Sequence, residues 1–180
     1  MSNPELVRAK DLDQWAREDA SHFEATILVR RLILATAAIA QIDFGAREDV
    51  FLSGWDGVLE ARGGNPFVPE GASRWEVGVK KSGLRAKAQS DYDKRTADPL
   101  GADPAATTFV FATVQSANWR KQWRDDRRKD DVWADVRAYG ASDLEIWLES
   151  APSVHYWISE RLGRDCQRHP KTDPLAAPEF

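Results

Sequence analysis

The chain has 180 residues, of which 42% are hydrophobic and 30% are charged, the size and composition of one folded domain rather than of a disordered chain. Its formal net charge of −4 excludes a histone-like cationic protein, so any contact with nucleic acid must come from a local basic face. The single cysteine excludes an intramolecular disulfide, and one Cys with three His argues against a structural zinc site.

No segment has the character of a membrane span or of a secretory signal. The longest apolar run in the N-terminal half covers residues 32–40, far short of the about 20 residues that a spanning helix needs. Residues 1–19 are polar and acidic, unlike the basic start and apolar centre of a signal peptide. We therefore expect a soluble, cytoplasmic protein without membrane contact.

The hydrophobic pattern of the first half predicts two helices followed by three strands. The expected helices cover 9–20 and 22–41, and the expected strands cover 50–52, 58–61 and 74–79. Three glycines and two prolines within 62–73 predict a loop between the last two of these strands.

The second half predicts alternating helices and strands. Helices are expected over 84–96 and 119–129, strands over 107–114 and within 132–139, and two last helices from Ser142 to Glu149 and from Pro152 to about Gly163. The continuous β-branched and aromatic run over 107–114 is typical of a strand buried on both faces. The order predicts an α/β fold with a central mixed sheet flanked by helices. One domain is expected over 1–163, with a flexible tail or linker over 164–180.

Two acids lie where neighbouring strands would bring them together. Asp56 precedes one expected strand and Glu76 lies within the next, so a hairpin would place them side by side. Adjacent carboxylates repel, and Mg²⁺, which prefers oxygen ligands, would relieve that repulsion. Glu76, Gly78 and Lys80 would share one face of their strand, with Gly78 leaving space between acid and amine. Lys80 would then orient or deprotonate an attacking water.

This order of an acid, a strand carrying Glu and a following Lys resembles the PD-(D/E)XK nuclease superfamily, whose core order is helix, three strands, helix, strand (αβββαβ). The local sequence over 54–71, 75–82, 90–96, 107–114 and 135–157 looks like a bacterial restriction-endonuclease-like domain. Such domains occur at the N-termini of larger defence-associated proteins. The resemblance extends over about residues 10 to 163.

The resemblance implies a site for Mg²⁺ or Mn²⁺. Its metal ligands would be Asp56, Glu76 and the main-chain carbonyl of Val77, and Glu24 on the long N-terminal helix would join them. The usual acid-x-Lys spacing places the lysine at position 78, which is Gly78 here. The catalytic lysine would therefore be Lys80, or Lys81 if a bulge shifts the register by one.

Two basic segments suit contact with nucleic acid. Six basic residues and two acids lie between positions 80 and 95, and the proposed DNA contacts are Arg85, Lys87, Lys94 and Arg95. The segment 119–129 has the same count, although its acids also favour a solvated helix with local ion pairs. Either face would grip phosphates without reading bases.

The expected function is Mg²⁺-dependent cleavage of DNA phosphodiester bonds, as an effector in bacterial anti-phage defence. The resemblance also implies further domains of a larger chain as partners, and a homo-oligomer is left open. One alternative is an inactive module of the same fold that binds nucleic acid or protein, in which Asp56 is an ordinary turn residue. A second alternative is a protein-interaction domain that uses a tryptophan-rich C-terminal region: Trp133, Trp147 and Trp157.

Overall fold

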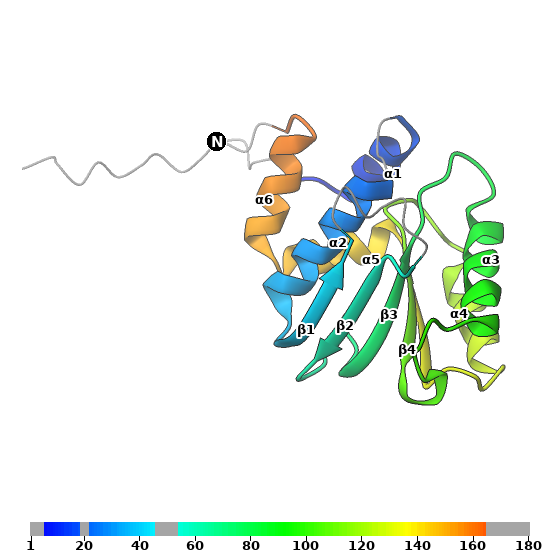
Figure 1. Ribbon diagram of the computed structural model, residues 1–180. Coiled ribbons are helices and arrows are strands. Elements are labelled where there is room, and N and C mark those ends of the chain that lie inside the picture. Colours follow the sequence, from blue (N-terminus) through cyan, green and yellow to red (C-terminus); the bar gives the residue numbers. More distant parts are fainter. Residues whose placement is uncertain (1–5, 19–21, 46–53, 165–180) are drawn as a thin grey trace, which may run out of the picture.

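The computed structural model describes residues 6–18, 22–45 and 54–164, and within them five strands form one mixed sheet (Figure 1). The strands lie in the order of the chain: β1 (Ile39–Phe44), β2 (Gly57–Ala61), β3 (Gly71–Val77), β4 (Thr108–Ala112) and β5 (Asp135–Tyr139). Strands β1, β2 and β3 form an antiparallel meander, whereas β3, β4 and β5 run parallel. The predicted mixed sheet is thereby confirmed.

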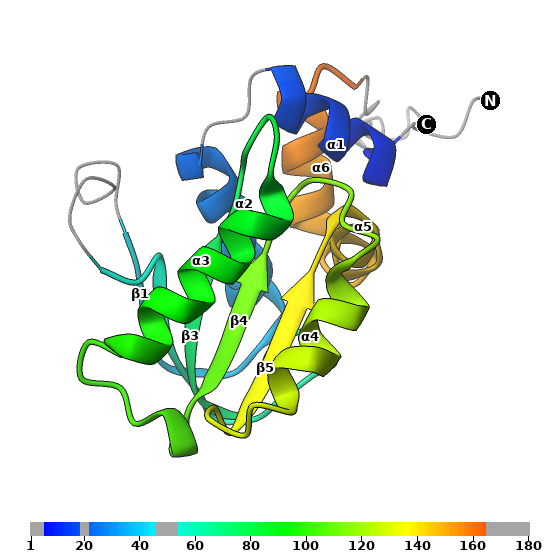
Figure 2. The ribbon, with the colours of Figure 1, turned by 90° about the vertical axis from the view of Figure 1, so that its right-hand side faces the viewer.

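Helices cover both faces of this sheet. One face carries α1 (Ala9–Glu18), α2 (His22–Thr36), α5 (Ala141–Glu149) and α6 (Pro152–Arg161). Figure 2 looks onto the other face, which carries α3 (Leu84–Ala97) and α4 (Arg120–Arg128). A short 3₁₀ turn, Pro104–Ala106, leads into β4. No helix in the described part of the chain is long and apolar enough to cross a membrane.

Alternating side chains of the strands divide the core between the two faces. Trp75 and Val77 of β3 pack in the larger cluster, together with Trp147 of α5. Phe109 and Phe111 of β4 point the other way, into the cluster beneath α3 and α4. Every residue of β4 is buried, which confirms the prediction of a strand covered on both sides.

The first strand was not expected, and the helix predicted over 22–41 ends at Thr36 instead. The side chain of Asn65 donates a hydrogen bond to the Thr36 carbonyl (3.0 Å). Residues 39–44 then pair with β2, so a partner distant in sequence overrides the helical pattern of the alanines. The strand expected over 50–52 lies outside the described residues.

The start of α5 also differs from the prediction. Gly140, and not Ser142, is the N-cap residue. The backbone N–H of Gly140 donates a hydrogen bond to the Asp143 carboxylate (2.8 Å). The capping interaction is thus present two residues earlier in the chain.

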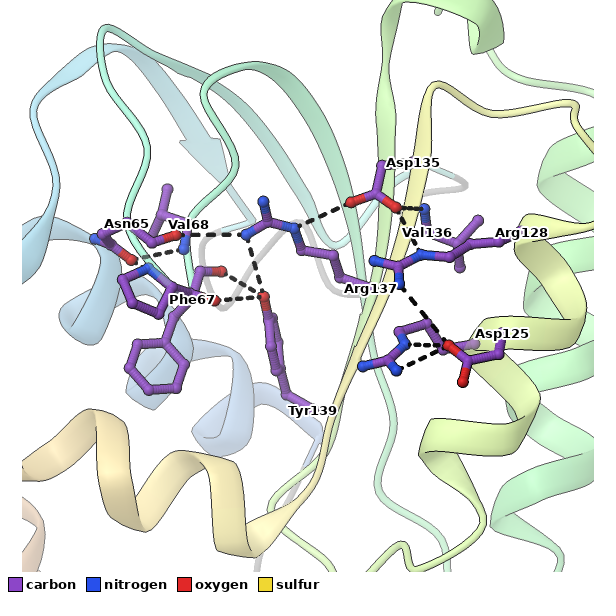
Figure 3. A network of polar contacts seen from close by, with 11 residues as sticks. Asn65, Phe67, Val68, Asp125, Arg128, Asp135, Val136, Arg137 and Tyr139 are labelled. Carbon is purple, nitrogen blue, oxygen red and sulfur yellow. Dashed lines mark hydrogen bonds and ion pairs between the residues drawn. The ribbon is translucent and has the colours of Figure 1, made fainter.

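The connection between β2 and β3 is tied to the edge strand β5 (Figure 3). The Asn65 side chain accepts hydrogen bonds from the N–H groups of Phe67 and Val68 (2.8 Å each). The Tyr139 hydroxyl donates to the Phe67 carbonyl (2.8 Å), and Arg137 donates to the Asn65 carbonyl (3.5 Å). These contacts hold the β2–β3 hairpin in one position, which matters because both candidate acids belong to it.

Candidate functional site

Asp56 and Glu76 lie opposite each other at one end of the β2–β3 hairpin. Gly57 pairs with Trp75 in the antiparallel register, so the preceding residue of one strand faces the following residue of the other. The structure therefore brings together the two acids proposed from the sequence. They are called the acid pair below.

Asp56 is held by two donors from different parts of the fold. Its Oδ1 lies 2.9 Å from Nε2 of His22, the first residue of α2, and its Oδ2 accepts a hydrogen bond from the Val77 N–H (2.7 Å). Burial alone would raise the pKa of Asp56, but the His22 and Val77 contacts hold that pKa below its ordinary value. The hydrogen bond to Asp56 in turn raises the pKa of His22. Asp56 is thus a fixed, ionised carboxylate.

Glu76 is more deeply buried, with 5% of its surface exposed. Its Oε1 accepts a hydrogen bond from Nε of Arg95 on α3 (2.5 Å). Burial, with repulsion from Asp56, raises the pKa of Glu76 to about 8, and Arg95 opposes this shift without cancelling it. Glu76 is therefore protonated more readily than an ordinary glutamate, because burial and the neighbouring Asp56 disfavour a second negative charge in the acid pair.

The stability of the metal-free protein is expected to fall as pH rises from about 5 to 8. The pKa of Glu76 is raised from 4.5 to about 8. The protonated Glu76 side chain therefore contributes its full stabilisation below pH 4.5, and this contribution is lost as pH rises through the pKa of about 8 in the folded protein. The raised pKa of His22 acts in the same direction above its ordinary value of 6.5. One such proton contributes a slope of at most about 1.4 kcal/mol per pH unit.

Urea unfolding in EDTA, measured across this pH range for wild type and Glu76→Gln, checks this expectation. The variant should show the shallower decline. Equal slopes in the two proteins would contradict the assignment of a raised pKa to Glu76.

Helix α3 brings two further charged groups to the edge of the acid pair. Lys87 and Asp91 form an ion pair of 2.6 Å on this helix and line a hollow with Lys80 and Ser90. The charge of Asp91 contributes to the raised pKa of Glu76, and that of Lys87 opposes the raised pKa of His22. Asp91 is therefore within electrostatic reach of Glu76, and Lys87 is within electrostatic reach of His22.

Position 78, where the motif lysine would stand, is filled by a neighbouring ring. A Cβ added to Gly78 would lie 2.5 Å from Cζ of Phe111. The space expected between acid and amine is thus absent. Strand β3 also ends at Val77, so the expected alignment of Glu76, Gly78 and Lys80 along one strand is wrong.

Replacing Gly78 by alanine is expected to destabilise the protein by about 1–3 kcal/mol, because the new methyl group must displace Phe111 in a packed core. Gly63→Ala is the matched control, since a Cβ there meets nothing within 4 Å, and its effect should stay within about 0.5 kcal/mol. Chemical denaturation of both variants measures the difference. Equal stabilities would show that Phe111 can move aside.

Lys80 and Lys81 follow the strand, and both residues are exposed. The main chain of Lys80 is fixed by the Gln115 side chain, which accepts from its N–H (2.8 Å) and donates to its carbonyl (2.9 Å). Its side chain lines the same hollow as Lys87. Within the described part of the chain, neither lysine side chain forms a hydrogen bond or ion pair with Asp56 or Glu76, whereas the charge of Lys87 acts on His22 beside Asp56.

The structure does not bring Glu24 to the acid pair. Its carboxylate pairs with Arg161 of α6, and it lines a different hollow with Asp11 and Glu18. Val77 contributes its N–H to Asp56, whereas the sequence had suggested its carbonyl as a metal ligand. Among residues 6–18, 22–45 and 54–164, no group of three His, Cys, Asp or Glu side chains is arranged to hold a metal ion.

The acid pair by itself nevertheless fits a magnesium ion. Mg²⁺ retains several waters and is commonly bound by one or two carboxylates together with substrate phosphate. Asp56 and Glu76 supply two carboxyl groups whose repulsion contributes to the raised pKa of Glu76, and a bound cation would favour the ionised form of both.

The proposed DNA-binding residues of α3 do not share one environment. Arg85 and Lys94 are exposed and Lys87 is half-buried. Arg95 is 5% exposed and points to Glu76, so its assignment to a DNA-facing surface is wrong. The side chain lies on the inner side of the helix because Glu76 and the Gly54 carbonyl both accept from it.

Helix α4 is confirmed as a helix with local ion pairs. Arg124, Arg127 and Lys129 pair with nearby acids, and Arg128 reaches Asp135 of β5 (2.8 Å). Its basic side chains are therefore largely engaged within the protein.

The tryptophans suggested as a partner surface are mainly core residues. Trp133 is 5% exposed and Trp147 is fully buried. Trp157 is half-buried, and the guanidinium of Arg31 lies 4.2 Å from its ring centroid. Their packing gives no support to the protein-interaction alternative.

Sequence reasoning missed His22, Asp91 and the inward role of Arg95. In the sequence, His22 is only a polar residue at the start of a predicted helix. Asp91 and Arg95 lie within a segment of mixed charge. A helical spacing of four residues joins Lys87, Asp91 and Arg95 on one face of α3, and this spacing is the signal that was available. Comparison with protein-family models, curated proteins and solved structures gives no match.

Proposed function

We propose that the protein is a metal-dependent endonuclease that cleaves DNA phosphodiester bonds, with Asp56 and Glu76 as its metal ligands. The observation that supports this proposal is the acid pair: two carboxyl groups from adjacent strands lie opposite each other at one end of a hairpin, and the charge of Asp56 contributes to the raised pKa of Glu76. Buried, mutually repelling carboxylates are a common property of catalytic sites. We also propose that the fold has a restriction-endonuclease-like core. The order helix, three strands, helix, strand is present in the consecutive elements α2, β1, β2, β3, α3 and β4.

The protein groups around the acid pair would have separate tasks. Bound Mg²⁺ would polarise a phosphoryl oxygen and lower the pKa of a coordinated water. His22 keeps Asp56 ionised and oriented through its 2.9 Å contact, and Arg95 fixes the position of Glu76. Lys87, beside the hollow, would place positive charge near the phosphate that undergoes attack.

The DNA backbone would follow the exposed basic side chains next to this site. Arg85 and Lys94 project from α3, and Lys80 and Lys81 precede that helix. Such contacts bind phosphate without reading sequence. A role as effector of anti-phage defence remains part of the proposal and rests on the family resemblance.

A non-catalytic module that binds DNA is the second candidate. The observation that favours it is the occupation of both acids by protein cations, His22 on Asp56 and Arg95 on Glu76. The closed position at Gly78 also favours it, because Phe111 excludes the motif lysine there.

A plasmid-nicking assay distinguishes these two functions. Wild type is compared with Asp56→Ala and Glu76→Ala in Mg²⁺, Mn²⁺ and EDTA. Glu60→Ala serves as the matched control, because Glu60 is exposed on β2 at the opposite end of the same hairpin. We expect metal-dependent nicking by wild type and the control, and none by the two site variants. Folded wild type that binds plasmid in a gel-shift assay but does not nick it with either metal would establish the binding module.

A further inference from the structure

Arg95 is a buried cation in the middle of the candidate site. Its side chain is 6% exposed, and its Nε lies 2.5 Å from Glu76 Oε1. Its Nη2 donates to the Gly54 carbonyl, and the guanidinium lies 5.0 Å from the ring centroid of Trp55. The arginine therefore joins Glu76 to the two residues that immediately precede Asp56.

This position conflicts with simultaneous binding of a metal ion. A buried carboxylate needs a cation or hydrogen-bond donors, and Arg95 supplies both to Glu76. A divalent ion shared by Asp56 and Glu76 would compete for the Glu76 carboxylate and would repel the guanidinium across a poorly hydrated space. The two cations are thus alternatives at the same carboxylate.

We propose that Arg95 is an internal competitor of the divalent cation, and that metal binding requires it to release Glu76. This inference rests on the metal site of the proposed function. The Gly54 carbonyl and the face of Trp55 already contact the guanidinium. After release from Glu76, the Arg95 guanidinium would keep its hydrogen bond to the Gly54 carbonyl and its cation–π contact with Trp55. The acid pair consequently has two states, one bound to Arg95 and one bound to metal.

Direct measurement of Mn²⁺ binding tests the competition without relying on activity. Free Mn²⁺ is followed by its EPR signal during titration of wild type, Arg95→Gln and Arg95→Lys. Removing the charge in Arg95→Gln should tighten Mn²⁺ binding on the order of tenfold, whereas Arg95→Lys, which keeps the charge, should tighten it less. Arg85→Gln, on the exposed side of the same helix, is the matched control and should match wild type. In the double variant Arg95→Gln/Glu76→Gln the gain should disappear.

A second measurement uses the wild-type protein, in case Arg95→Gln does not fold without metal. The Nε–H signal of Arg95 in a ¹⁵N-labelled sample, assigned by its loss in Arg95→Lys, reports the bond to Glu76. Saturating Mg²⁺ should shift this signal and speed its exchange with water. An unchanged signal, or equal Mn²⁺ affinity in folded Arg95→Gln and wild type, would overturn the proposal.

The outcomes also separate this inference from the proposed nuclease activity. Metal-dependent nicking with no gain of Mn²⁺ affinity in Arg95→Gln removes the competition and leaves the nuclease. A gain of Mn²⁺ affinity without nicking by any of these proteins supports the competition and removes the nuclease.

Discussion

Replacing Glu76 by glutamine is expected to lower the rate of plasmid nicking at least about a hundredfold, while the protein stays folded. A carboxylate that holds the metal contributes to a transition-state stabilisation of several kcal/mol, and each 1.36 kcal/mol corresponds to about a tenfold rate change. Glutamine keeps the shape of the side chain, and its amide oxygen can accept the hydrogen bond that Arg95 Nε donates to Glu76 Oε1 in the wild type (2.5 Å). Initial nicking rates at saturating Mg²⁺ measure the loss of activity, and circular dichroism of the same samples shows whether the variant is folded.

Glu76→Gln is a cleaner probe than Asp56→Asn. Both Asp56 oxygens are in use, one at His22 and one as acceptor from the Val77 N–H. An amide group would present its NH₂ to one of these partners, and a buried N–H left without an acceptor costs about 1–3 kcal/mol. Loss of activity in Asp56→Asn therefore mixes chemistry with stability.

Glu60→Gln, on the exposed part of β2, controls for a general change of charge and should nick at the wild-type rate. If Glu76→Gln also nicked at the wild-type rate, Glu76 would not be a metal ligand, and the proposed mechanism would fail.

Replacing Trp147 by alanine is expected to reduce the free energy of unfolding by about 3–5 kcal/mol, which is the cost of removing a large aromatic side chain from a packed core. Trp147 is fully buried and stacks on Phe67 with ring centroids 5.1 Å apart. It also packs against Trp75 and donates a hydrogen bond to Thr36 Oγ1 (2.9 Å). The substitution thus removes contacts to α2, β3 and the β2–β3 connection together.

Trp157→Ala is the matched control for this loss, because Trp157 is half-buried under Arg31. Its cost should be roughly 1–2 kcal/mol, since less area and one cation–π contact are removed. Urea denaturation gives both values. A cost for Trp147→Ala no larger than that for Trp157→Ala would contradict the central place of Trp147 in the core.

Local patterns in the sequence determined the elements whose burial is uniform or strictly periodic. The run over 107–114 predicted β4, because a strand covered on both faces is apolar at every position. The helices α3 and α6 were predicted nearly to their ends, because glycine and proline mark them. The facing of Asp56 and Glu76 was predictable as well, since a hairpin with one register places those two positions together.

Only the tertiary structure decided what each acid contacts and which neighbouring positions are open. His22 and Arg95 reach Asp56 and Glu76 from helices that lie before and after the hairpin, and helical periodicity alone does not say against which strand a helix packs. The sequence suggests free space beside Gly78. In the fold, Phe111 of the neighbouring parallel strand β4 fills that space. Strand β1 likewise depends on pairing with β2, since Ile39 to Gln41 continue the helical alanine pattern locally. The sequence thus determined the candidate acids, while packing between distant segments determined their partners and their burial, which together shift their pKa values.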